Sequence, residues 1–106
     1  MERFFNSSGS FVAFRRSKTD RFLFDSSGNW IGWFPWGDEQ AVDQSGSYLG
    51  TVVRNRLLKD LRARYRGYPG YPGYPGYAGY PGYPGFAGYV AKPAMFDDIE
   101  EERLKG

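Results

Sequence analysis

Short runs of aromatic and aliphatic residues, separated by glycine and small polar residues, recur along the first sixty positions of the chain. Runs of this length, rich in aromatic and β-branched residues and bounded by turn-forming residues, are typical of β-strands. The pattern therefore predicts a meander of short strands. Their expected ranges are 2–5, 10–16, 21–24, 29–34, 39–42, 47–53 and 56–59.

One ten-residue segment occurs three times among these runs, at 5–14, 24–33 and 42–51. Each copy has an apolar residue, Asn or Asp, any residue, Ser, Gly, Ser or Asn, an aromatic residue, an aliphatic residue and then Ala or Gly. The central glycines are spaced 19 and then 18 residues apart. Because near-constant spacing of a repeated segment is the signature of repeat architectures, we expect one structural unit in three copies.

Each copy has the chemistry of a β-hairpin turn. The Asn or Asp side chain can accept hydrogen bonds from backbone N–H groups further along the turn. The glycine can supply the left-handed residue that completes a bulged hairpin loop. The residues predicted to form these turns are Asn6 and Gly9, Asp25 and Gly28, and Asp43 and Gly46.

A small residue also recurs at one fixed strand position, as Ala13, Gly32 and Gly50. A small residue repeated in every unit indicates close approach of the backbone or crowding at that point. In a ring of units this point would be the axis. The alternative is that these residues mark bends or bulges in ordinary strands.

The repeated Asp-x-x-Gly-x-aromatic-aliphatic-Gly unit, followed by a Pro-rich tripeptide tail, resembles the four-fold beta-flower proteins. These are uncharacterised small bacterial proteins in which hairpins surround a pseudo-four-fold axis. The resemblance covers roughly residues 1–60 and implies an all-β ring or flower, without implying an activity. Because only three units are clear, the fourth is expected to combine Glu2–Phe5 with the strand near Arg56. That closure would pair the first and last strands and remove exposed edges.

The tail repeats three residues with almost no interruption. From Gly67 to Gly88 every third residue is glycine, Tyr or Phe follows each glycine, and Pro precedes the next one except at Ala78 and Ala87. A polyproline-II-like or disordered segment is the favoured prediction, since polyproline II has three residues per turn. A spiral of type II turns and a collagen-like helix are the alternatives. Extended polyproline II over 67–88 would span roughly 65 Å, so the tail must project, bend back or lie across neighbouring subunits.

We therefore divide the chain into a hairpin-repeat head (1–60), a basic connector (61–66), the Tyr-Pro-Gly tail (67–90) and an acidic C-terminal segment (91–106). The connector is predicted as a short helix over about 58–66 or as a strand with its arginines on one face. The C-terminal segment is expected to fray. A short helix over about 96–104 is the alternative.

The composition argues against catalysis. The chain has no histidine and no cysteine, which removes the commonest general base and the usual metal ligands. Asp25 and Asp43 are the obvious carboxylates, but each already has a role in a turn. We therefore expect no enzyme, no cofactor and no metal site. The chain begins without a long apolar run, so neither a signal peptide nor a membrane span is indicated, and a cytoplasmic protein is expected.

Two functional hypotheses remain. In the first, the protein is an interaction or scaffold protein whose aromatic head holds a polyproline-II-type segment, either its own tail or a partner's. In the second, the Arg- and Tyr-rich connector and tail bind RNA or a condensate, although a net charge of +2 gives no nucleic-acid footprint by itself. A homo-oligomer is compatible with both. The candidate binding residues are Trp30, Trp33, Trp36 and Tyr48 in the head, and Arg62, Arg64 and Arg66 in the connector.

Overall fold

The structure, a computed structural model that describes residues 1–106, is built from β-strands and one short 3₁₀ helix. The seven strands predicted in the head are confirmed to within one or two residues at each end. None of the structure's helical segments is long and apolar enough to cross a membrane. The elements are β1 (Glu2–Phe5), β2 (Phe11–Arg15), β3 (Phe22–Asp25), β4 (Trp30–Trp33), β5 (Gln40–Asp43), β6 (Tyr48–Val53), β7 (Arg56–Asp60), β8 (Phe96–Asp97) and η1 (Glu101–Leu104).

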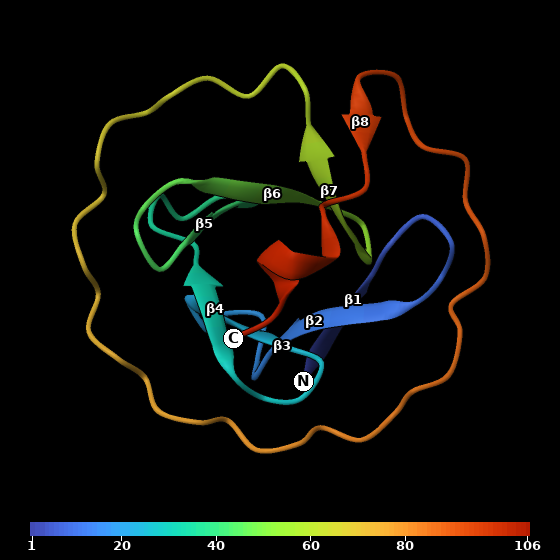
Figure 1. Cartoon of the computed structure of the whole chain (residues 1–106), viewed down its shortest axis with the longest axis horizontal. Helices are drawn as coiled ribbons and strands as arrows, with labels where there is room; N and C mark the ends of the chain where they lie inside the picture. Colours follow the sequence, from blue (N-terminus) through green and yellow to red (C-terminus); the bar gives the residue numbers. More distant parts are fainter.

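The first seven strands close into a ring (Figure 1). Consecutive strands pair antiparallel, and β1 pairs with β7 in parallel through Phe5 and Arg56. A parallel closure follows from an odd number of alternating strands. The Phe5 N–H donates to the Asn55 carbonyl at 2.9 Å. The predicted meeting of the first and last strands of the head is thus confirmed. However, β1 and β7 form no hairpin together, because β1 forms its hairpin with β2 and β7 pairs with β6 and β8.

The three repeated segments form hairpins of the same geometry, as predicted. In each, the glycine N–H donates to the carbonyl of the Asn or Asp three residues earlier, at 3.0–3.1 Å. The Oδ1 atom of that Asn or Asp accepts a second bond, from the backbone N–H four residues on, at 2.9–3.0 Å. The glycines have positive φ angles of 93°, 96° and 90°, and the pairing shifts register at the same place in each hairpin. These are the bulged loops that the turn residues favour.

The ring interior is filled by side chains from every strand and is crowded where the small residues lie. In each hairpin an inward residue of the first strand pairs with a small residue of the second. The three pairs are Phe4 with Ala13, Leu23 with Gly32, and Ala41 with Gly50. A Cβ atom added at Gly32 would overlap the backbone carbonyl of Val42 on the adjacent strand. The predicted close backbone approach is therefore confirmed at this position.

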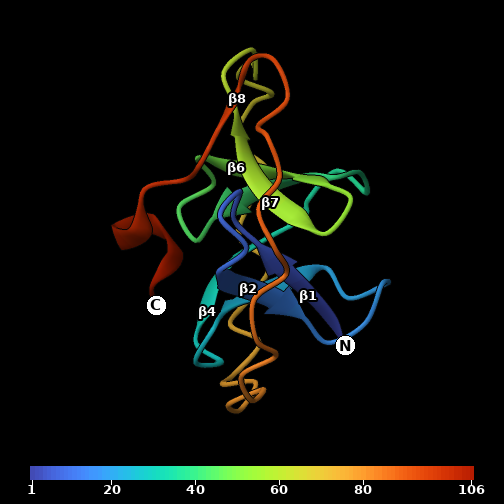
Figure 2. The same ribbon diagram turned by 90° about the vertical axis from the view of Figure 1, so that its right-hand side faces the viewer.

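The C-terminal segment completes the core, so the expectation of a frayed terminus is wrong. Strand β8 pairs with β7, and η1 lies over the centre of the ring, at one end of it (Figures 1 and 2). Ile99 and Leu104 are buried with the ring's inward residues. The Ile99 side chain contacts Gly50, where the Ala41–Gly50 pair leaves the most space. The predicted helix over 96–104 shrinks to Glu101–Leu104, because the residues before it pair with β7 or extend into the ring.

The connector is not helical. Strand β7 continues to Asp60 and is followed by a turn, after which the chain is extended. The predicted strand with the connector's arginines on one face is also absent, because the strand pairing of β7 with β6 and β8 ends at Asp60 and the arginines follow it. Leu57 and Leu58, which suggested a helical face, are both buried as neighbouring residues of this strand.

The tail runs around the outside of the ring, and we call residues 67–90 the belt (Figure 1). Seen edge-on it is a narrow band (Figure 2). The prediction of polyproline II is wrong, because its φ angles are all near −75°, whereas every belt glycine has a φ between 84° and 90°. A collagen-like helix is excluded for the same reason. The type II spiral is also wrong, since residues 63–93 contain no turn or bend. The belt is an extended chain with one left-handed residue in three.

The fit between Gly50 and Ile99 gives a first prediction. Gly50→Ala should lower the free energy of unfolding by about 1–3 kcal/mol, because the new methyl group overlaps the Ile99 side chain. Ile99→Val alone should cost about 0.5–1.5 kcal/mol. Urea unfolding of both variants and of the double variant measures the coupling. The double variant should lose less free energy of unfolding than the two single variants lose together, because valine makes room for the new methyl group. A loss equal to the sum would contradict the contact between Gly50 and Ile99.

The Asp43 turn gives a second prediction. Burial of this carboxyl opposes its ionisation, but bonds from the Ser45 hydroxyl, from two backbone N–H groups and from Arg103 outweigh burial and hold its pKa below its ordinary value. A carboxyl whose pKa is lower in the folded state stabilises the protein when the pH is above its pKa in the unfolded chain. This stability is lost as the pH falls through its pKa in the folded protein. Asp43→Asn should therefore be less stable than the native protein at pH 7, by under about 1 kcal/mol for a partly exposed pair. The difference should shrink by pH 3 in urea unfolding, and a constant difference would contradict the assignment.

Candidate functional site

The belt is held on the head by backbone hydrogen bonds at the two triplets that lack proline. The N–H of Ala87 donates to the Gly9 carbonyl, and the N–H of Ala78 donates to the Gly28 carbonyl, both at 2.9 Å. Proline has no N–H and could make neither bond. The two interruptions of the Tyr-Pro-Gly pattern are therefore docking positions, each placed on the turn of one hairpin.

The spacing of these positions matches the belt to the ring. Ala78 and Ala87 are nine residues apart and contact the second and first hairpin turns, so three triplets cover one hairpin. Nine residues before Ala78 stands Pro69, which with Tyr68 lies against the third turn glycine, Gly46. No N–H is available there, and this contact is made by side chains alone.

The turn glycines are also the points where the belt comes closest to the head. A Cβ atom added to Gly9 would lie 2.7 Å from the backbone nitrogen and oxygen of Gly88. At Gly28 it would overlap the backbone of Gly79. Glycine is thus needed here for two reasons, since a positive φ and a backbone neighbour both exclude a side chain.

A buried arginine fixes the last part of the belt. Arg56 is only 7% exposed, and its Nη1 donates to the Gly88 carbonyl at 2.7 Å and to the Asn6 carbonyl at 3.0 Å. Its Nη2 donates to the Ala87 carbonyl at 3.3 Å. Arg56 therefore joins the ring closure, the first hairpin turn and the belt through one guanidinium group.

Trp30 is the one predicted aromatic residue whose ring packs against tyrosine rings of the belt, edge-on to Tyr71 and tilted against Tyr74. Its ring centroid lies 5.8 Å from those of Tyr71 and Tyr74, and its Nε1 donates to the Gly32 carbonyl at 2.7 Å. It belongs to a second apolar cluster with Phe14 and Phe24, on the outer side of the strands, against which Ala78 packs. The belt therefore covers an apolar outer face of the ring.

The other three predicted aromatic residues have structural partners within the head and connector. Trp33 is buried, with the Arg21 guanidinium 4.8 Å from its ring centroid. Trp36 lies under Arg66 at 4.3 Å, and the Tyr48 hydroxyl accepts a bond from the Asp60 N–H at 2.8 Å. Trp30 and Trp33 were expected on opposite faces of one strand with at least one in the core, and both are buried.

The three connector arginines contact different neighbours. Arg62 pairs with Asp60 at 3.2 Å, and its guanidinium lies 5.5 Å from the ring centroid of Phe96. Arg66 pairs with Asp38 at 2.6 Å, and although burial opposes ionisation of Asp38, this bond contributes to a pKa below its usual value. Arg64 is exposed. RNA binding by this set stays a prediction.

Sequence reasoning missed the residues that dock the belt. Besides Ala78, Ala87 and Arg56, these include Arg3, whose Nη2 donates to the Pro81 carbonyl at 3.1 Å, and Val90, whose N–H donates to the Ser7 carbonyl at 2.9 Å. The signal available in the sequence was the replacement of proline by Ala78 and Ala87. An alanine has a backbone N–H that proline lacks, and its return at a regular spacing in a Pro-rich repeat indicates that this N–H donates a hydrogen bond.

Neither the models of known protein families, nor curated proteins, nor solved structures give a match to this chain. The resemblance to the four-fold beta-flower proteins stays a prediction. The candidate site is accordingly argued from its own geometry.

The docking positions give a third prediction. Ala87→Pro removes the N–H that bonds to Gly9, and a typical loss of about 1 kcal/mol corresponds to about fivefold faster exchange of belt amides such as that of Val90. Amide hydrogen exchange followed by NMR measures this. Ala87→Gly keeps the N–H, and Pro84→Ala changes a belt proline that makes no side-chain or backbone hydrogen bond to the head. Both controls should leave Val90 less affected, and equal effects in all three variants would contradict the docking role.

Proposed function

We propose that the protein is a non-catalytic interaction or scaffold protein whose head holds its own Tyr-Pro-Gly segment as a belt and presents the belt's aromatic rings to other proteins. The observation that carries the proposal is the placement of the rings. Seven tyrosines and Phe86 lie along the belt, and each of these residues is between 59% and 76% exposed. Monomeric proteins rarely expose so continuous a row of apolar surface without a partner for it.

The belt is suited to contact and unsuited to catalysis. Residues 67–90 contain no charged side chain, so apart from two alanines and Val90 the belt consists of aromatic residues, prolines and glycines. Tyrosine offers a rigid apolar ring with one polar end, which suits it to protein interfaces. Docking on the head restricts the belt before it meets a partner, and this reduces the conformational entropy that binding costs.

The chemistry of the rim favours an extended Pro-rich partner. Aromatic-lined surfaces recognise proline-rich segments, and a segment that is already held extended binds with little further loss of conformational entropy. The belt itself carries both the rings and the prolines, so a second copy of this chain offers a complementary surface. Contact between the belts of two copies is therefore the first interaction to test.

A fourth prediction follows for self-association. The triple variant Tyr80→Ser, Tyr83→Ser and Tyr89→Ser removes exposed rings that make no hydrogen bond or ring contact with the head. Sedimentation of the native protein should show concentration-dependent association that this variant weakens by about tenfold or more, since aromatic pairs are each worth about 0.5–1.5 kcal/mol. Tyr65→Ser, at an exposed tyrosine outside the belt, is the control and should associate like the native protein.

The tryptophan bands of the near-ultraviolet circular dichroism spectrum check that the three tryptophans of the head keep their environment in each variant. A native protein that stays monomeric at high concentration would contradict association between copies. The same belt should then be titrated with a Pro-rich peptide. Failure of both experiments would overturn the proposed display of the rings.

A further inference from the structure

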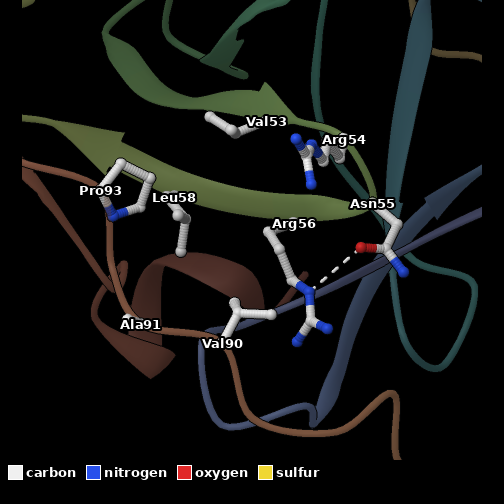
Figure 3. A pocket seen from close by; sticks show the side chains of 8 residues that line it. All are labelled: Val53, Arg54, Asn55, Arg56, Leu58, Val90, Ala91 and Pro93. Atoms are coloured by element: carbon white, nitrogen blue, oxygen red, sulfur yellow. Dashed lines mark hydrogen bonds between the residues drawn. The ribbon is translucent and has the colours of Figure 1, made fainter.

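The largest cavity lies where the belt leaves the ring, and no aromatic ring of the belt lines it. Its volume is about 440 Å³, within the range of about 300–1,000 Å³ that is usual for small-molecule sites. Figure 3 shows the lining residues coming from two segments, the β6–β7 turn with its flanking strands, and the end of the belt with the residues that follow it, Val90 to Pro93. The apolar part of the lining comes from Val53, Leu58, Val90 and Pro93.

Two arginines line the same cavity, and no acidic residue does. The buried guanidinium of Arg56 has only carbonyl oxygens and the Asn55 amide oxygen as partners, with no carboxylate among them. Arg54 is exposed at the cavity and makes no ion pair and no side-chain hydrogen bond. A cavity with two cations and no counter-charge attracts an anion.

The backbone at Arg54 is an independent observation. Val53 pairs with Arg56, so Arg54 and Asn55 form a two-residue hairpin loop, and Arg54 has a φ of 59°. Asn55 does not share this positive φ. A positive φ at the first loop position is typical of a type II′ turn, which favours glycine there. A long cationic side chain at a position that suits glycine indicates that the side chain itself is used.

We propose that this cavity binds a small anion with an apolar body, such as a medium-chain carboxylate. The carboxylate meets the guanidinium of Arg54 and the positive field of Arg56, because guanidinium groups pair strongly with carboxylates. The hydrocarbon part lies against the aliphatic lining. The site is separate from the proposed display of aromatic rings and does not depend on it.

The probe is octanoate, added below its micellar concentration to the full-length protein. Methyl signals of Val53, Leu58 and Val90 in NMR spectra should shift with saturation. Octanol has the body without the charge, and acetate has the charge without the body. Both should bind at least about tenfold more weakly, since a charge-assisted hydrogen bond and several buried methylene groups each contribute that much. Equal binding of octanol, or no saturable shift with octanoate, overturns the proposal.

Arg54→Gly separates binding from folding. Glycine suits the positive φ of this position, so the variant should unfold at the same temperature as the native protein or at a higher one, and its octanoate affinity should fall about tenfold or more. Arg64→Ala removes the same charge from the connector and should leave the affinity within about twofold. Native affinity in Arg54→Gly would overturn the proposal, as would an equal loss in Arg64→Ala.

Discussion

The limited space at the axis of the ring is the constraint on which the rest of this structure depends. Seven strands enclose an interior that is too narrow for a large side chain at every position. Each hairpin meets the limit by pairing an inward residue with Ala or Gly, and at Gly32 the adjacent strand's backbone occupies the space of a side chain. The least filled pair, Ala41 with Gly50, is the one that Ile99 reaches. Protein interiors are closely packed, so the space beside Gly50 has to be filled by a side chain. The C-terminal segment supplies that side chain and is thereby linked to the hairpin repeat.

Closing the ring creates a second surface to cover. Strand residues alternate between the axis and the outside, so that Leu23 faces inward while Phe24 and Trp30 form a cluster on the outer side. The belt lies over that cluster and hydrogen-bonds to the turns that flank the strands. An aromatic content of 20% exceeds what one small core needs, and the two covered faces of the ring together with the exposed rings of the belt account for it.

The sequence predicted local features of this fold well. Turns at Asp25 and Asp43 were recognisable because their hydrogen bonds lie within five consecutive residues. The belt's path was not predictable, because a three-residue period is equally compatible with several backbone conformations until a neighbouring surface selects one. Ile99 was assigned to a fraying end for a similar reason. Its partner Gly50 lies far away in the chain, and no local pattern connects the two.

The belt can also be understood as an enlarged hairpin loop. Strands β7 and β8 pair antiparallel, with Lys59 opposite Asp97, so the 35 residues between Asp60 and Phe96 connect the two strands of a fourth hairpin. Lengthening a loop from about 5 to 35 residues raises the entropic cost of closing it by only about 2 kcal/mol. The backbone bonds of Ala78, Ala87 and Val90 to the head, each worth about 1 kcal/mol, are enough to offset it. Because the ring is closed by the pairing of β1 with β7, the loss of the belt's bonds to the turns would not by itself open the ring. The small residues that close the ring and the missing prolines that dock the belt therefore control two separable properties of one chain.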